Sequence, residues 1–298
     1  MVSSDGLDAR ELTFSQAHGY ETLPQPLKLE EVSTKARNAI WNVLYVHVYA
    51  DHAEVNASVS SRLLKQSVWF GIFYTLHTEV LGNTADQFNA QDHVQNLLQY
   101  REDVLYGMRF NKLFDFLQTV MRHPSCPGEV IHGIAKAFHD EGLAYFVDTE
   151  GSPTIVPAAT PEEGSQIREA LDELHRASLD GAVAHLKDAS ACINVSDWSG
   201  SIRESIHAVE SVARILDPKA ASTLGPALTS LEKQGRLHPA LKKAFSNLYG
   251  YTSDEQGIRH ALLEDVESPA GRDEAVFMLG ACASFASYLW RRHQDGTE

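Results

Sequence analysis

The sequence predicts a mainly α-helical protein made of two domains. Most of the 298-residue chain repeats apolar residues at steps of three and four, the spacing that lines one face of a helix. One short segment carries a hairpin pattern instead, and a proline-rich stretch follows it. A chain of 298 residues also fits two domains of about 150 residues each. We therefore expect a helical N-terminal domain with a small β-hairpin, followed by an antiparallel helix bundle.

Three segments of the N-terminal half predict helices. Residues 30–49 place apolar side chains on one side, and residues 66–81 are apolar almost all round, as in a central helix. Gly82 and Asn83 then give a stop signal. The third predicted helix lines one face with Phe110, Leu113, Phe114, Leu117, Val120 and Met121.

The predicted domain boundary lies near residue 160. Short apolar runs at 143–147 and 154–156 flank a glycine-bearing turn, which indicates a β-hairpin. Three prolines then crowd residues 152–163, which cannot continue as a helix. We place one domain over residues 1–160 and the other over residues 161–298.

The C-terminal half returns to helical patterns. Residues 162–194 predict one long helix, or two with a break near Gly181, and residues 273–292 predict the last one. Two apolar seams between them have the spacing of packed bundle helices. They are Ile202, Ile206, Val209, Ala213 and Leu216, and then Leu237, Leu241, Ala244 and Leu248. Pro239 near the start and Gly250 past the end bound the second seam.

Composition restricts the possible partners. With 40 acidic and 25 basic residues the net charge is −15, which disfavours general DNA binding and binding to anionic membranes. A local basic site for RNA stays possible. The longest apolar run, residues 276–290, is shorter than the roughly 20 residues of a membrane span, so we expect a buried helix and no membrane partner.

Cysteine usage and the first residues indicate a cytoplasmic protein. Cys126, Cys192 and Cys282 are odd in number and far apart, so they predict neither a disulfide framework nor a metal knuckle. Residues 1–14 lack the basic and apolar regions of a signal peptide. Standard cofactor and metal motifs are missing, and His47 and His52 lie on different helical faces. We expect no cofactor and no metal.

Two polar stretches are candidates for chemistry. Arg203, His207, Glu210 and Arg214 are spaced 4, 3 and 4 apart and so form a stripe beside the first seam. The stripe fits a ladder of ion pairs, Glu210 to Arg214 in particular, or one wall of a site. Both interpretations stay open.

The second stretch covers residues 249–260. Ser253 and Gln256 form a capping box, which predicts that a helix begins there and offers its N-terminus to an anion. Arg259 would supply a donor fork for phosphate, His260 a group that titrates near neutral pH, and Asp254 could orient either one. The alternative is a capped surface helix with solvated side chains.

At these residues the chain resembles bacterial abortive-infection proteins with an AbiJ-like N-terminal domain and a HEPN-type C-terminal helical domain. The resemblance rests on segments 14–20 and 36–42 in the first half, and on 201–210, 237–243 and 249–260 in the second. Together they extend over nearly the whole chain. The resemblance implies a role in phage defence.

The resemblance also implies a chemistry, with one departure. HEPN ribonucleases use an Arg followed after four to six residues by a His, on a helical dimer that cleaves RNA without metal. The positions upstream of His260 that this spacing requires hold no Arg, and Arg203 lies one residue too close to His207. Arg168 and His175 fit the spacing, but at the start of the domain. A catalytic Arg would therefore be Arg259 or Arg203.

The expected function is that of a phage-defence effector or toxin, a metal-independent endoribonuclease acting through the C-terminal domain. His260 would be the general base, with Arg259 and Arg203 stabilising the phosphate charge. Glu210, Asp254 and His207 would support them in one pocket. The alternative is a non-catalytic HEPN-like module for binding or dimerisation. In either case we expect a homodimer, because HEPN-type domains pair and residues 276–290 need cover.

Overall fold

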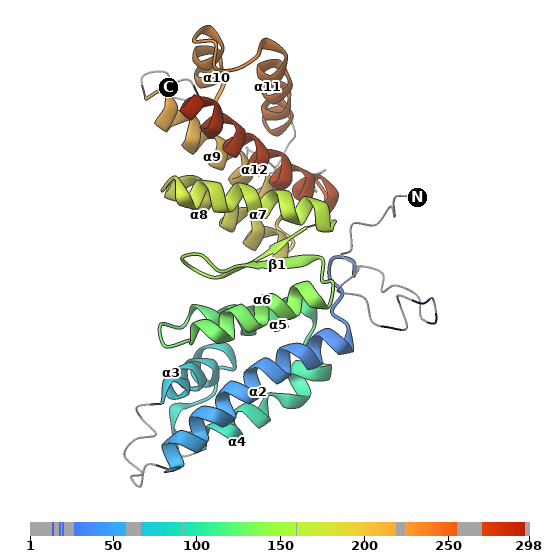
Figure 1. Cartoon of the computed structure of the whole chain (residues 1–298), viewed down its shortest axis with the longest axis vertical. Coiled ribbons are helices and arrows are strands. Elements are labelled where there is room, and N and C mark those ends of the chain that lie inside the picture. The colour runs from blue at the N-terminus through green and yellow to red at the C-terminus, as the bar shows by residue number, and fades with distance from the viewer. Residues whose placement is uncertain are drawn as a thin grey trace, which may run out of the picture.

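The computed structural model describes most of the chain, namely Phe14, His18, Tyr20 and residues 27–57, 67–90, 92–158, 160–218, 224–254 and 270–295. Over these residues the protein is mainly α-helical, and its strands form one two-stranded hairpin, as predicted. The molecule is elongated. The N-terminal helices lie at one end, the hairpin near the middle and the C-terminal helices at the other end (Figure 1).

The N-terminal half combines regular and irregular helices. Its α-helices are α2 (Thr34–Ala57), α3 (Val68–Thr75), α4 (His93–Gln99), α5 (Phe110–Arg122) and α6 (Gly128–Asp140). Its short irregular helices are the π-helices η2 (Leu76–Val80) and η4 (Asp103–Gly107) and the 3-10 helix η3 (Ala85–Gln87).

The predicted helices of this half are present with shifted ends. The helix expected over residues 30–49 cannot include Glu30, whose φ of 71° lies outside the right-handed helical region. It begins at Thr34 and continues to Ala57. Helix α3 continues into η2 and stops before Gly82, whose φ of +67° ends it as expected. In α5 the predicted stripe is buried except for the half-buried Phe110.

The hairpin lies between two clusters of buried apolar side chains. Strand β1 (Tyr145–Asp148) pairs antiparallel with β2 (Thr154–Pro157). Side chains alternate along a strand, so the two faces serve different neighbours. Phe146 and Val156, which are paired across the hairpin, pack into the cluster of the C-terminal helices. Tyr145, Val147 and Ile155 pack into the cluster of the N-terminal helices. The hairpin therefore joins both cores.

The C-terminal half consists of helices. They are α7 (Pro161–Arg176), α8 (Asp180–Asn194), α9 (Trp198–Leu216), α10 (Leu224–Lys233), α11 (Pro239–Asp254) and α12 (Arg272–Asp295). Residues 162–194 thus form two helices, but the break precedes Gly181 and falls where Ser178 has a φ of 56°. Gly181 instead permits close packing, because a Cβ there would lie 2.7 Å from the Ser211 hydroxyl of α9.

The first predicted seam forms the buried face of α9. Ile202, Ile206, Val209, Ala213 and Leu216 are all at most 8% exposed. Helix α12 packs against α9 and α7 (Figure 1), and most of its apolar residues join the same cluster. The cover that residues 276–290 require therefore comes from this chain itself, although Phe277 stays 57% exposed.

The second predicted seam is correct for Leu237 and Leu248, which pack into the C-terminal cluster, and wrong for the two residues between them. Leu241 and Ala244 are exposed in α11, whereas Phe245, Leu248 and Tyr249 pack against the C-terminal cluster. Phe245 stacks on Phe285 of α12, and burying these aromatic rings rotates the helix away from the predicted face. The expected end at Gly250 is also wrong, because α11 continues to Asp254. Across the described residues, no helix has both the length and the apolar character needed to cross a membrane.

Candidate functional site

The C-terminal helices bring two imidazoles to one carboxylate. His185 of α8 and Glu204 and His207 of α9 form this group, called here the His–Glu–His cluster. Nδ1 of His185 lies 2.7 Å from Oε2 of Glu204, and Nδ1 of His207 lies 3.5 Å from the same oxygen. The two imidazole ring centroids are 5.2 Å apart. Both rings therefore face one shared acceptor.

The cluster is half-buried and open to solvent. The side chains of His185, Glu204 and His207 are 36%, 22% and 39% exposed. An ionised carboxylate only accepts hydrogen bonds, so the close Nδ1 of His185 donates to Glu204. In a neutral His185 this contact leaves Nε2 unprotonated, so that Nε2 can accept a proton. A His207 ring with a proton on each nitrogen would be a charged proton donor beside it. The cluster can therefore both accept and donate a proton.

Local sequence fixes where these side chains lie. Helices α8 and α9 run antiparallel and are joined by a tight turn in which Ser196 has a φ of 63°. Asp197 caps α9 by accepting from Gly200 N–H at 2.8 Å. From that start, Glu204 and His207 lie three residues apart on one face, and His185 comes from the facing helix.

Charged and sulfur-bearing neighbours border the cluster. Arg203 lies one helical turn before His207. Burial raises the pKa of Cys192 to about 11, with the negative charges of Asp197 and Glu204 adding to the rise and Arg203 opposing it. A raised pKa keeps the thiol of Cys192 protonated at physiological pH, which disfavours a role as a nucleophile.

The predicted stripe on α9 takes part in two different contacts. Glu210 and Arg214 form the expected ion pair, at 3.8 Å. His207 instead turns to Glu204, so it belongs to the cluster and not to a simple ladder. The ion-pair interpretation therefore holds for Glu210 and Arg214, whereas the interpretation of the stripe as one wall of a site stays a prediction.

The second predicted stretch is only partly described. Arg259 and His260 lie outside the described residues, and of Asp254 only the backbone is described, so the expected pocket between this stretch and Arg203 stays a prediction. The predicted helix start at Ser253 is wrong, because Ser253 lies inside the last turn of α11. A capping box depends on a spacing of three residues, which helix interiors also contain.

Sequence reasoning missed His185 and Glu204. They are 19 residues apart and come together only because α8 and α9 pack side by side. The available signal was Glu204 and His207 at i and i+3, a pair that helices use to present a carboxylate and an imidazole on one face.

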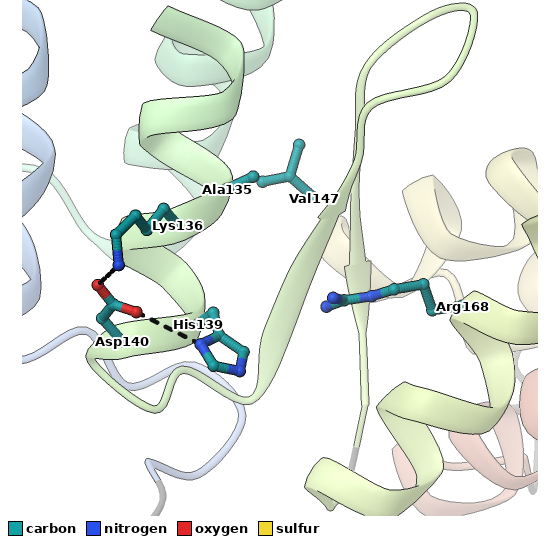
Figure 2. A pocket seen from close by; sticks show the side chains of 6 residues that line it. All are labelled: Ala135, Lys136, His139, Asp140, Val147 and Arg168. Atoms are coloured by element: carbon teal, nitrogen blue, oxygen red, sulfur yellow. Dashed lines mark hydrogen bonds and ion pairs between the residues drawn. The ribbon is translucent and has the colours of Figure 1, made fainter. Parts of the chain in front are cut away.

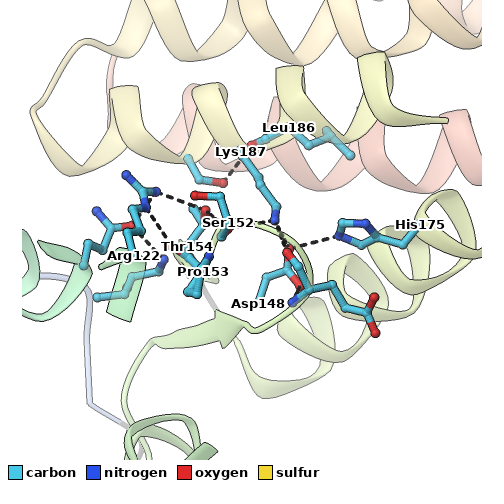
Figure 3. A network of polar contacts seen from close by, with 12 residues as sticks. Arg122, Asp148, Ser152, Pro153, Thr154, His175, Leu186 and Lys187 are labelled. Atoms are coloured by element: carbon cyan, nitrogen blue, oxygen red, sulfur yellow. Dashed lines mark hydrogen bonds and ion pairs between the residues drawn. The ribbon is translucent and has the colours of Figure 1, made fainter. Parts of the chain in front are cut away.

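A second polar network surrounds the turn of the hairpin (Figure 3). His175 of α7 and Lys187 of α8 both reach Asp148, with Nε2 and Nζ 3.2 and 2.8 Å from its carboxylate. The Asp148 side chain is 4% exposed. Lys187 also donates to the backbone carbonyls of Glu150 and Ser152, at 2.6 and 3.0 Å. This buried carboxylate is thus fully paired, which is the pattern of a structural tie.

The N-terminal half completes the network. Arg122 of α5 donates to Pro153 O at 2.8 Å and to the Thr154 hydroxyl at 3.1 Å (Figure 3). Gln118, also in α5, accepts from Ile155 N–H at 3.0 Å. The turn and second strand of the hairpin are therefore bonded to helices of both halves.

A small pocket opens between α6, β1 and α7 (Figure 2). In it Lys136 and His139 both contact Asp140 of their own helix, at 2.5 and 3.4 Å. Arg168 extends into the pocket from the other side and lies over the Phe146 ring, 4.7 Å from its centroid. His175, its partner in the sequence spacing, binds Asp148 instead. Arg168 and His175 therefore fit the Arg-to-His spacing in the sequence but contact different residues in the structure.

One group of described residues could hold a metal. In the His–Glu–His cluster one ligand atom from each residue lies within 4.8 Å of the others. Comparisons with protein-family models, with curated proteins and with solved structures found no match for this chain. The candidate site is accordingly defined by geometry, and the family resemblance stays a prediction.

Proposed function

We propose that the C-terminal half cleaves RNA as a metal-independent endoribonuclease, with the His–Glu–His cluster as its centre of proton transfer. The observation that carries this proposal is that two imidazoles share one carboxylate oxygen, at 2.7 and 3.5 Å, in a position that solvent reaches. The resemblance to abortive-infection proteins supports RNA as the substrate and phage defence as the setting.

The cluster has the groups that phosphodiester cleavage needs. His185, held by Glu204 through Nδ1, removes the proton of a ribose 2′-OH with Nε2. The 2′ oxygen then bonds to the adjacent phosphorus as the bond to the 5′ oxygen breaks. Protonated His207 gives its proton to that leaving oxygen. The products are a 2′,3′-cyclic phosphate and a 5′-hydroxyl, and no further reactant is required.

Glu204 and Arg203 complete this assignment. Glu204 fixes the ring of His185 and stabilises the charge that develops on both imidazoles. Arg203 lies one turn from His207, within reach of a phosphate bound beside the cluster, where its charge offsets that of the pentavalent transition state. The general-base role that the sequence suggested for His260 is assigned here to His185, because His185 is held by Glu204. Arg259 and His260 remain predicted contributors to the same pocket, with Glu210 and Asp254 in supporting roles.

The test is RNA cleavage by the purified full-length chain, using total RNA and tRNA with and without EDTA. We expect cleavage that survives EDTA and leaves cyclic phosphate ends. His185→Gln, Glu204→Gln and His207→Gln should each lower the rate at least about 100-fold. His132→Gln is the matched control, because this exposed imidazole bonds only its own helix, at Gly128 O, in the described contacts.

Variants of Arg259 and His260 test whether cleavage depends on the second predicted stretch, on the His–Glu–His cluster or on both. His260→Ala and Arg259→Ala are expected to abolish activity and toxicity as well, whereas Arg168→Ala should change neither. Loss of cleavage in His260→Ala combined with full activity in Glu204→Gln would overturn the role of the cluster. Intact RNA after incubation with the wild-type chain would overturn the proposal as a whole.

The net charge of −15 favours one rival, a non-catalytic HEPN-like module that binds a partner or a second copy of the chain. Such a module would leave RNA intact under all conditions. Light scattering addresses the homodimer that both functions predict, and a monomer at micromolar concentration would contradict it.

A further inference from the structure

We infer that the His–Glu–His cluster binds a divalent transition-metal ion of the zinc class and that bound metal switches the site off. The first half of this inference rests on the ligand set alone. The second half, inhibition, rests on the proposed function. The two halves therefore need separate measurements.

The donor set matches zinc in number and kind. Two imidazole nitrogens and one carboxylate oxygen, with a fourth position left to water, are ligands of open zinc sites. Tetrahedral bonds of about 2.0–2.1 Å set neighbouring ligand atoms about 3.3 Å apart. Nδ1 of His207 already lies 3.5 Å from Oε2 of Glu204, whereas Nδ1 of His185, at 2.7 Å, must move outward by less than about 1 Å.

The ligands come from a rigid frame. All three lie within regular helices, and α8 and α9 approach closely where Gly181 meets Ser211. A site on packed helices holds its geometry better than one on loops. Because Glu204 and His207 are one turn apart on α9, both side chains lie on the same side of the helix, where one ion can be bound by both.

The same donors select the class of metal. Imidazole nitrogen suits Zn²⁺, Co²⁺, Ni²⁺ and Cu²⁺, whereas Mg²⁺ and Ca²⁺ prefer sets made of oxygen. A single carboxylate supplies too few oxygens for either of the latter. We therefore expect Zn²⁺ and Co²⁺ to bind and Mg²⁺ not to bind.

Metal binding and proton transfer exclude each other at these atoms. An ion held by Nδ1 displaces the proton that His185 donates to Glu204, and the neutral ring then carries its proton on Nε2. That nitrogen has no lone pair left to act as a base. Glu204, once bound to the ion, no longer supports an imidazolium at His207. Free zinc should thus inhibit RNA cleavage reversibly.

Binding is measured without RNA. The full-length chain, stripped with EDTA and dialysed, is titrated with Zn²⁺ by calorimetry and with Co²⁺ by visible absorption. We expect one ion per chain and absorption bands typical of four-coordinate Co²⁺. His185→Gln, Glu204→Gln and His207→Gln should each weaken binding at least about 10-fold. His132→Gln, at an exposed imidazole of α6, should not.

Stoichiometric binding that persists when His185→Gln, Glu204→Gln and His207→Gln are combined in one chain would overturn the metal site, as would an absence of binding to the wild-type chain. Inhibition is measured next, by adding Zn²⁺ to the cleavage reaction and reversing it with EDTA. Zinc that binds the cluster without slowing cleavage overturns the inhibitory half alone. An inactive wild-type chain that still binds one zinc ion contradicts the proposed function and its inhibition by zinc, but leaves the metal site standing.

Discussion

Two regions of the molecule hold a histidine against a carboxylate, and their surroundings give them opposite properties. At the turn end of the hairpin, Asp148 is 4% exposed and takes both His175 and Lys187. Between α8 and α9, Glu204 is 22% exposed and takes two imidazoles, and it forms no ion pair with a lysine or arginine among the described residues. In the first arrangement a lysine is paired with the buried carboxylate, whereas in the second the carboxylate meets two partly exposed imidazoles. Burial and partner type thus separate a contact suited to a structural role from one suited to the proposed proton transfer.

Lys187→Met gives the largest expected loss of stability. It removes the cation from a buried carboxylate and two hydrogen bonds to the hairpin turn, so we expect a loss of about 3 kcal/mol in the free energy of unfolding. Urea denaturation measures it. The control is Lys112→Met, which breaks the surface pair with Asp115, whose lysine is 71% exposed, and should cost less than about 0.5 kcal/mol. Equal losses would contradict the structural role of the network.

Arg122→Met tests the bonds between the hairpin and the N-terminal half. The variant loses the donors to Pro153 O and the Thr154 hydroxyl but keeps much of the aliphatic side chain. We expect a loss of about 2 kcal/mol and faster amide exchange in the hairpin. An unchanged midpoint in urea would show that the hairpin depends on apolar packing alone.

These features differ in how far the sequence could predict them. The buried faces of α5 and α9 follow from their periodicity, because each helix has apolar residues on one side only and that side must face the core. The face of α11 does not, since Phe245 competes with Leu241 and only the aromatic surface of Phe285 decides between them. Local patterns therefore predict helices better than they predict which neighbour each helix meets.

The candidate site shows the same limit. His207 is found from the polar stripe on its own helix, but His185 belongs to another helix and has no sequence relation to it. Only the packing of α8 on α9 places it opposite Glu204. Asp148 and Lys187, which are 39 positions apart, meet for the same reason. Contacts between helices are properties of the packed chain.

Asp172→Asn tests how the carboxyl group of Asp172 in α7, close to the acidic residues of the hairpin, makes stability depend on pH. Burial raises the pKa of Asp172 above its ordinary value, the negative charges of Asp148 and Glu150 add to the rise, and Arg168 and Arg176 oppose it. A raised pKa in the folded state means that folding favours the protonated form, so stability is lost as pH rises from about 4 through the raised value. The variant should equal wild type near pH 3 and become the more stable near pH 7 in urea titrations. The reverse order would contradict this.

Glu210→Gln has the smallest expected effect. Its ion pair with Arg214 is long, at 3.8 Å, and the arginine is 58% exposed. We expect a change in stability below about 0.5 kcal/mol, further reduced by salt. A loss above about 1 kcal/mol in urea would mean that the stripe on α9 stabilises the bundle.

The most direct test compares His207→Asn with His175→Asn, one histidine from each region, and measures unfolding and RNA cleavage for both. His207→Asn should lose cleavage at least about 100-fold with less than about 0.5 kcal/mol lost in stability, since its side chain is 39% exposed. His175→Asn, 15% exposed and bonded to Asp148, should lose about 1–2 kcal/mol and keep its cleavage rate. The opposite pattern, or two variants that lose both properties together, would contradict the division into a reactive and a structural histidine.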